Sequence, residues 1–420
     1  MKKRTLAALG LCLSLLLSAC GSAAAPGDGE IPGKKRVEGL FSAASGADTM
    51  ALDDSFAVEA EAPGDAAPDE PGDSNAPAPA AGTLTAGEWN DCASFDEWLA
   101  LLEQPYWQEI GDSWGLTAQH RVAVRVTDEA GEPCVNTAVE LLDGGSVLYT
   151  ARTDAAGTAY LYYDVDGTDQ TVPDSVHAEG VETDISDGAA ELTLPDGSGA
   201  PQKLDLMFMV DTTGSMGDEL AYIKEELADV VARVEDAAGV SVRTSVNFYR
   251  DTEDDYIVRY FDFKTVEQSQ QDLAPQSAEG GGDYPEAVHT ALDNAINGHS
   301  WDEDAVKLCI LVLDAPPHDE QDVKQQLRTL LPEAAEKGVR ILPVVSSGAD
   351  ETTEYLCRTF ALLTGGTYVF LTDDSGVGDK HLEPTVGSYT VEPLNDCLVR
   401  IIARYCGQET AVSAYVPNEQ

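Results

Sequence analysis

The second half of the chain alternates apolar runs with amphipathic segments. Residues 204–210 form a nearly continuous apolar run, which is typical of a strand buried on both faces of a parallel sheet. The segment after it repeats apolar side chains at intervals of three and four residues, so it should form a helix with one buried face. Its apolar positions are Leu220, Ile223, Leu227, Val230, Val231 and Val234.

The same alternation continues to residue 405. It predicts further strands at 240–249, 256–263, 306–313, 339–345 and 367–371, and helices at 284–297, 320–337, 353–363 and 393–405. Because proline lacks an amide hydrogen and clashes with the preceding turn, Pro332 should break or kink the helix at 320–337 into two short helices. Together these elements predict an α/β domain with a doubly wound parallel sheet over residues 203–406.

Residues 119–198 have a different pattern, in which short strand-like segments are separated by turn residues. Val122, Val124 and Val126 alternate with polar side chains, as in a strand with one buried face. The other strand-like segments lie at 139–141, 147–150, 160–162 and 192–194. Several short strands at this spacing predict a small all-β sandwich. Since it contains no catalytic grouping, we expect it to be a spacer.

Residues 83–118 contain four of the five tryptophans of the chain. Phe95, Trp98, Leu99 and Leu102 recur at helical spacing, which predicts a short helix with an apolar face. We expect the tryptophans to pack against a neighbouring domain. An exposed carbohydrate-binding surface is the alternative interpretation.

The N-terminus resembles the signal peptide of a bacterial lipoprotein. A basic start at residues 2–4 precedes an apolar run from Leu6 to Leu17, and Leu17-Ser-Ala-Cys20 is similar to a lipobox. The resemblance implies cleavage before Cys20 and acylation of its thiol. Because the apolar run is shorter than the roughly 20 residues of a membrane-spanning helix, we expect an extracytoplasmic protein that is lipid-anchored to the cell membrane.

Residues 21–82 are rich in Ala, Pro, Gly and Asp and poor in large apolar side chains. Such a composition cannot bury enough surface to fold, so this segment is predicted to be a disordered tether. A flexible chain of this length reaches on the order of 45 Å. Residues 407–420 are expected to form a short tail after the last domain.

The charge balance narrows the classes of partner. The chain has 75 acidic and 25 basic residues, a net charge of −50, which argues against nucleic acid and favours cations and basic ligands. The cysteines after Cys20 include no C-x-x-C pair, so neither a zinc site nor a redox motif is predicted. Cys309 lies inside an apolar strand and should be a buried thiol.

Oxygen-bearing side chains lie in three of the loops of the predicted α/β domain. These loops are Asp211-Thr-Thr213-Gly-Ser215, Gly280-Gly-Gly-Asp283-Tyr-Pro-Glu286 and Asp314-Ala-Pro-Pro. Because ligands bind beyond the carboxyl ends of strands in this architecture, the three loops should converge. Carboxylates and hydroxyls without His or Cys are hard donors, which suit Mg²⁺ first, with Mn²⁺ or Ca²⁺ as alternatives.

These loops resemble the metal-ion-dependent adhesion site of von Willebrand factor A domains. The D-x-S-x-S motif of that family is matched at Asp211 and Ser215, with Thr213 in place of the first serine. Asp314 matches the aspartate of the third loop, and Asp283 stands where the second loop normally has threonine. Asp283 either coordinates the metal or caps a helix that begins near Tyr284.

The resemblance spans residues 203–406 and implies a non-catalytic domain for adhesion or assembly. An acidic or neutral oxygen group of a protein ligand would then complete the coordination of the metal. Residues 119–198 are similar to carboxypeptidase regulatory-like and Ig-like modules, through the strand and turn pattern that begins at Val122.

Two other classes of function stay open. A structural wall protein with a vestigial metal site has the same sequence pattern. Ser215 also lies on a strand–turn–helix junction, as a hydrolase nucleophile does, but G-x-S-x-G requires glycine where this chain has Thr213. His318 or His381 would then have to supply a base, and no spacing identifies either of them.

Overall fold

The computed structural model describes residues 79–169, 171–197, 199–217 and 219–408. The predicted signal at 1–20 with Cys20, and the tether as far as residue 78, lie outside these residues, as do residues 409–420. None of the described helices is both long enough and apolar enough to cross a membrane.

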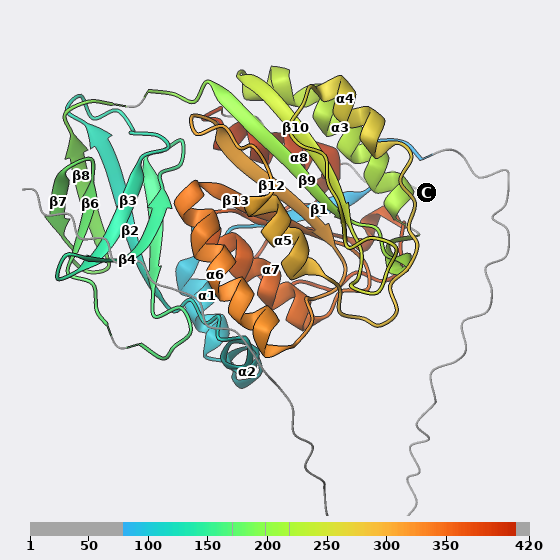
Figure 1. Ribbon diagram of the computed structural model, residues 1–420, viewed down its shortest axis with the longest axis horizontal. Helices are drawn as coiled ribbons and strands as arrows, with labels where there is room; N and C mark the ends of the chain where they lie inside the picture. The colour runs from blue at the N-terminus through green and yellow to red at the C-terminus, as the bar shows by residue number, and fades with distance from the viewer. Residues whose placement is uncertain (1–78, 170, 198, 218, 409–420) are drawn as a thin grey trace, which may run out of the picture. The chain divides into compact units, whose positions relative to one another are not determined.

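A mixed eight-stranded sheet lies at the centre of the α/β domain (Figure 1). Its strand order is β11-β10-β9-β12-β13-β14-β1-β15. The parallel strands are β10 (Ser241–Tyr249), β9 (Lys203–Asp211), β12 (Val306–Leu313), β13 (Val339–Val345) and β14 (Tyr368–Leu371). The sequence predicted all five of them. Four are largely apolar, as expected of strands buried on both faces, whereas β10 also has buried polar side chains at Thr244, Ser245 and Asn247.

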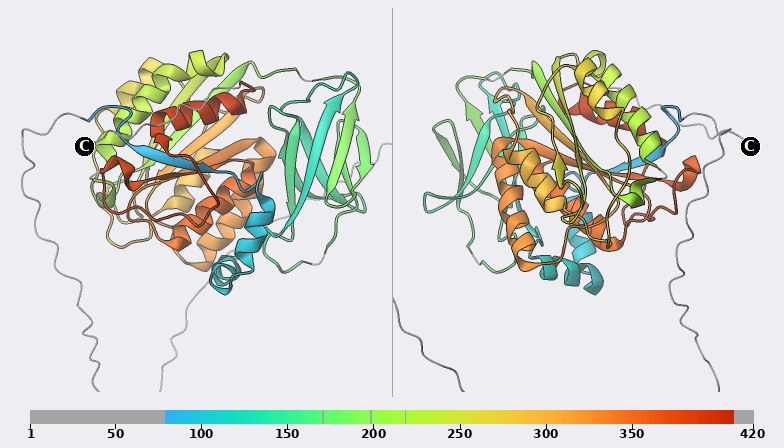
Figure 2. Two further views of the ribbon diagram at one scale, coloured as in Figure 1. Left: turned by 180° about the vertical axis from the view of Figure 1, so that it is seen from behind. Right: turned by 45° about the vertical axis from the view of Figure 1, so that its right-hand side comes forward.

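Antiparallel strands at the two sides of this parallel core correct the prediction of a parallel sheet. They are β11 (Val258–Arg259), β1 (Thr85–Trp89) and β15 (Glu392–Pro393). β11 is much shorter than the strand predicted at 256–263, and β1 comes from the tryptophan-rich segment. Figure 2 shows β1 running along the sheet beside α8.

Helices cover both faces of the sheet (Figures 1 and 2). One face carries α3 (Leu220–Ala238), α4 (Val266–Leu273) and α8 (Leu394–Tyr405), and the other carries α5 (Val288–Asn297), α6 (Gln321–Lys337) and α7 (Glu351–Thr364). Leu206 and Phe208 of β9 belong to the apolar core under α3 and α8, whereas Met207 and Met209 belong to the core under α5, α6 and α7. The strand therefore supplies apolar side chains to two separate layers.

The helix α6 continues through Pro332, so the prediction of two short helices is wrong. Leu330 and Leu331 before the proline, and Ala334 and Ala335 after it, are all buried. We attribute the continuity to this packing, which holds both halves of α6 against the same core and offsets the loss of one backbone hydrogen bond.

Residues 119–198, called the β module below, form two sheets. The first sheet contains β5 (Thr158–Tyr163), β2 (His120–Asp128) and β8 (Ala189–Leu194). The second contains β4 (Ser146–Arg152), β3 (Ala138–Asp143), β6 (Ser175–Ala178) and β7 (Val181–Asp184). Val122, Val124 and Val126 are buried, as their alternation predicted. The pattern did not reveal β6 and β7.

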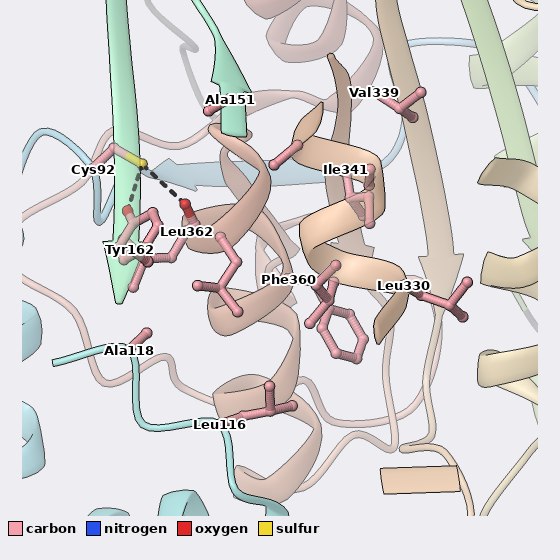
Figure 3. Packing of buried hydrophobic residues seen from close by; sticks show 14 of the residues in the cluster. Cys92, Leu116, Ala118, Ala151, Tyr162, Leu330, Val339, Ile341, Phe360 and Leu362 are labelled. Atoms are coloured by element: carbon pink, nitrogen blue, oxygen red, sulfur yellow. Dashed lines mark hydrogen bonds between the residues drawn. The ribbon is translucent and has the colours of Figure 1, made fainter. Parts of the chain in front are cut away.

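The β module packs directly on α7 (Figure 3). The thiol of Cys92 lies 3.7 Å from the hydroxyl of Tyr162 and donates a hydrogen bond to the carbonyl of Leu362. The Tyr149 hydroxyl donates to the carbonyl of Leu363 at 2.7 Å. One apolar core includes side chains of both the module and the helices. The predicted spacer is therefore packed against the α/β domain over a shared core.

The tryptophan-rich segment adds a helical hairpin to this core. It forms α1 (Phe95–Leu102), the helix predicted from its apolar spacing, and α2 (Pro105–Trp114). Trp98 and Trp107 contact Tyr355 of α7 at centroid distances of 5.3 and 6.2 Å. All four tryptophans of the segment are buried, which confirms the packing role and excludes the exposed carbohydrate-binding surface.

Candidate metal centre

The three oxygen-bearing loops meet at one edge of the sheet. The Gly214 amide donates to the carbonyl of Gly280 at 3.1 Å, and the Glu279 amide donates to the carbonyl of Thr212 at 3.0 Å. The loop after β12 joins them through the Glu286 amide, which donates to the carbonyl of Pro316 at 3.0 Å. The convergence that the strand order predicted is therefore present.

The first loop fixes one oxygen of a buried carboxylate and makes no hydrogen bond to the other. Asp211 Oδ1 accepts hydrogen bonds from the Thr213 amide at 2.9 Å and from its hydroxyl at 2.7 Å. The hydroxyls of Thr213 and Ser215 lie 3.3 Å apart, on the same side of the turn. Asp211 Oδ2 is buried and makes no hydrogen bond of ordinary geometry among the described residues, although the buried Tyr249 hydroxyl lies beside this carboxylate and acts to lower its pKa.

The carboxylates of Asp211, Asp314 and Glu286 influence one another at this edge of the sheet. Burial and then the negative charge of Asp314 raise the pKa of Asp211 to about 7. Burial raises the pKa of Glu286 to about 9, with further contributions from Asp211, Asp251 and Asp314. Such mutual effects require the charged groups to be close together. A bound cation would favour their ionised forms.

The predicted residue Asp283 differs from these carboxylates in its exposure. Its side chain is exposed, and α5 begins only at Val288, so the prediction that Asp283 caps a helix starting near Tyr284 is wrong. Glu286, by contrast, is 2% exposed, and its Oε2 atom has no hydrogen-bond partner in the part of the chain that the structure describes. The structure thus brings Asp211, Thr213, Ser215 and Asp314 together with Glu286.

Sequence reasoning missed Glu286, although its position after Pro285 in the glycine-rich loop was visible. The loop needs its glycines, because Gly280 and Gly281 have φ values of +81° and +73°. A Cβ atom on Gly280 would also collide with the Asp254 carboxylate, which accepts the Gly281 amide at 2.9 Å. This folding of the loop places Glu286, rather than Asp283, towards the buried edge.

The donor chemistry fits a hard divalent cation. The described residues contain no cluster of three or more His, Cys, Asp or Glu side chains in metal-binding geometry. The candidate set instead combines carboxylates with the two hydroxyls of the first loop. Buried oxygens on Asp211 and Glu286 that make no hydrogen bond of ordinary geometry are the kind of atoms that a metal ion or ordered water satisfies.

The two histidines considered as catalytic bases have other partners. The Nε2 atom of His318 lies 2.6 Å from Asp251 Oδ1. His381 contacts Asp373 through Nδ1 at 2.9 Å and Glu219 through Nε2 at 2.8 Å. Neither ring hydrogen-bonds to Ser215 in the described structure, so Ser215 lacks the geometry of an activated nucleophile there.

His381 should make the stability of the domain depend on pH. Burial lowers its pKa, but the hydrogen bonds to Glu219 and Asp373 outweigh burial and hold the pKa above its usual range. Its contribution to the free energy of unfolding is therefore fully present below about pH 6.5 and is lost as the pH rises through the folded pKa. Urea unfolding between pH 5.5 and 8.5 should show this loss in wild type and a flatter profile in His381→Gln. Parallel profiles would contradict the assignment.

Substitutions of Glu286 and Asp283 should change the affinity for Mg²⁺ by different amounts. Glu286→Gln removes a carboxyl group that a bound cation would ionise, so calorimetric titration should show Mg²⁺ affinity reduced by about tenfold or more, since close charge pairs contribute more than 1 kcal/mol. Asp283→Asn, at the exposed position of the same loop, should change the affinity by less than about threefold. The reverse order would identify Asp283 as the coordinating residue.

The match to a family model agrees with the fold of the α/β domain. Residues 205–376 match the family model of the von Willebrand factor A domain. A protein of Acanthamoeba polyphaga mimivirus, described as ariadne-like RING finger, is 27% identical over 191 residues, which cover 40% of this chain and 18% of that protein. The chain thus spans less than a fifth of that relative. The conserved hypothetical protein BatB of Bacteroides thetaiotaomicron has a similar solved structure with a TM-score of 0.35 and 12% identity, covering 49% of this chain and 100% of BatB.

Proposed function

We propose that this protein captures a protein ligand through a divalent metal ion, Mg²⁺ in the first instance, at its von Willebrand factor A domain. Asp211, Thr213, Ser215 and Asp314 would hold the ion, with Glu286 beside them. The observation that carries the proposal is the fully buried carboxylate of Asp211 next to two hydroxyls, 3.3 Å apart, at the carboxyl end of β9.

Each residue has a separate part in this proposal. Thr213 orients Asp211 through two hydrogen bonds to Oδ1, which leaves Oδ2 for the ion. The carboxylates of Asp211 and Asp314 offset the cost of dehydrating the ion. When bound, the ion would have an open coordination position, which an oxygen atom of the partner would fill. No group with the geometry of a catalytic base is assigned at this site, so the proposed activity is binding alone.

A capture experiment tests the proposed function. The full chain, immobilised on beads, is incubated with candidate partner proteins in Mg²⁺ and in EDTA, and Mg²⁺ is titrated calorimetrically into the same preparation. We expect one saturable Mg²⁺ site and retention of a partner only in Mg²⁺. Equal retention in EDTA, or the absence of a saturable site, would overturn metal-dependent capture.

We further propose that the protein is displayed outside the cell membrane by a lipid on Cys20. The support is the lipobox-like Leu17-Ser-Ala-Cys20 after a short apolar run, followed by an acidic Ala/Pro/Gly tether at 21–82. The β module at 119–198, which we assign to the regulatory-like or Ig-like class, would then be held close to the binding domain.

Cys20→Ser is expected to move the protein from the membrane fraction into the medium, because the serine hydroxyl cannot form the thioether of the lipid. Fractionation and mass spectrometry of the N-terminal peptide measure the two effects together. Ala19→Gly serves as a control, since it leaves a small residue before the same thiol. A wild-type peptide without an acyl mass would refute the anchor.

A further inference from the structure

A groove of about 430 Å³ lies beside the candidate metal centre. The helix α2 forms one wall, with Tyr106, Glu109 and Trp114. The opposite wall consists of Pro285, Pro316, Pro317 and the start of α7 at Asp350 and Thr352. Two loops of the metal centre therefore also line the groove.

The same two loops contribute to the groove and to the candidate metal centre. Pro285 directly precedes Glu286, whose amide donates to the carbonyl of Pro316. The Tyr284 hydroxyl connects the same loop to the start of α7, because it accepts the Asp350 amide at 2.9 Å and donates to the carbonyl of Gly348 at 3.2 Å. A ligand at the metal would consequently lie next to the groove.

Contacts with the α/β domain hold α2 in place. Arg328 donates to the carbonyl of Trp114 at 3.0 Å, and Lys324 donates to the hydroxyl of Ser113 at 3.2 Å. With Trp107 stacked on Tyr355, the hairpin is fixed at several points. The groove is thus formed before a ligand arrives, which lowers the entropic cost of binding.

The groove combines an exposed aromatic ring with carboxylates. Tyr106 is 53% exposed, the largest exposure of any aromatic side chain at the groove. Glu109 and Asp350 line the groove with it, and Asp350 Oδ1 also accepts the Thr353 amide in the first turn of α7. Burial and then the charges of Glu351, Asp350 and Glu109 raise the pKa of the Tyr106 hydroxyl. The lysine at the groove, Lys324, is itself buried and forms an ion pair with Asp319.

We propose that this groove binds a lysine or arginine side chain of the partner protein. The inference rests on the proposed function, since the same partner would place an oxygen at the metal. Charge complementarity favours a cation, which is attracted both by the face of the tyrosine ring and by the carboxylates. An anion would be repelled by the same carboxylates. An apolar group would displace their bound water without offering a hydrogen bond in exchange. The net charge of −50 adds long-range attraction for a basic partner.

The probe is a five-residue peptide, acetyl-Gly-Ser-Lys-Pro-Gly-amide, with a counterpart that has norleucine in place of lysine. Both are titrated into the full chain in 0.15 M salt, with the tryptophan indole ¹H–¹⁵N signals as readout, because Trp114 lines the groove. We expect the Trp114 signal to shift with the lysine peptide and the norleucine peptide to bind at least threefold more weakly. Tyr106→Ala and Glu109→Gln should each weaken the lysine peptide by about threefold to tenfold. Glu191→Gln, an exposed carboxylate of the β module, is the matched control and should leave the affinity unchanged.

The outcomes of these titrations distinguish the proposed cation groove from the proposed metal-dependent capture. Equal binding of the two peptides, or an equal effect of Glu109→Gln and Glu191→Gln, would overturn the groove assignment as nonspecific attraction to an acidic protein. The titration is repeated in EDTA, where the preference for lysine should persist because it needs no metal. If the preference persists while calorimetry shows no Mg²⁺ site, the proposed metal function fails and the cation groove is supported.

Discussion

Asp211→Ala is expected to abolish Mg²⁺ binding and the increase in melting temperature that Mg²⁺ produces. Asp211 is fully buried at the end of β9, with Oδ1 held by Thr213 and the buried hydroxyl of Tyr249 beside the carboxylate. A ligand that binds only the folded state stabilises it by about 2.7 kcal/mol at 100 times its dissociation constant. The wild type should show a stabilisation of this order in saturating Mg²⁺, measured by thermal unfolding, and the variant should show none.

Two controls make this result specific. Asp211→Asn keeps the shape of the side chain and an oxygen for Thr213 but removes the charge, so it should also lose Mg²⁺ binding while keeping the fold. Glu191→Ala removes an exposed carboxylate elsewhere and should respond to Mg²⁺ as the wild type does. An equal increase in melting temperature in all variants would show that Mg²⁺ acts on the acidic surface as a whole.

Asp91→Ala is expected to lower the free energy of unfolding by about 3–5 kcal/mol, because it leaves a buried guanidinium without its main counter-charge. Arg358 donates two hydrogen bonds to Asp91, from Nε at 2.9 Å and from Nη2 at 2.7 Å. Both side chains are at most 2% exposed. Urea unfolding followed by circular dichroism measures the loss.

A combined variant tests the cause of that loss. Because Arg358 also contacts the buried Glu354, Arg358→Met and Glu354→Gln are introduced together into the Asp91→Ala background, which removes the stranded guanidinium without leaving a buried carboxylate unpaired. The triple variant should be more stable than Asp91→Ala alone. The partly exposed pair of Arg233 and Asp229 is the control, and Asp229→Ala should cost less than about 1 kcal/mol. If Asp91→Ala and Asp229→Ala lowered the free energy of unfolding by similar amounts, the buried ion pair would not be the interaction that holds the segment before α1 against α7.

The sequence by itself determined the parallel core and most of the candidate site. Strands such as 306–313 and 339–345 were predicted with the bounds that the structure shows, because burial between two helical layers favours mostly apolar side chains, here interrupted only by Lys307 and Arg340 near the strand starts. Asp211, Thr213 and Ser215 lie within one turn, so their proximity follows from local geometry. Asp314 joins them because the ends of adjacent parallel strands must lie side by side.

Tertiary structure alone decided the edges of the sheet and which of Asp283 and Glu286 is buried. The strand β1 pairs Ala86 with Leu371, a partner far away in sequence, so no local periodicity could reveal it. The glycine-rich loop is shaped by hydrogen bonds to Thr212 and Asp254, which fold it so that Glu286 is buried and Asp283 is exposed. The groove beside the site likewise depends on the contact between α2 and α7. The sequence pattern of these two helices does not indicate that they pack together.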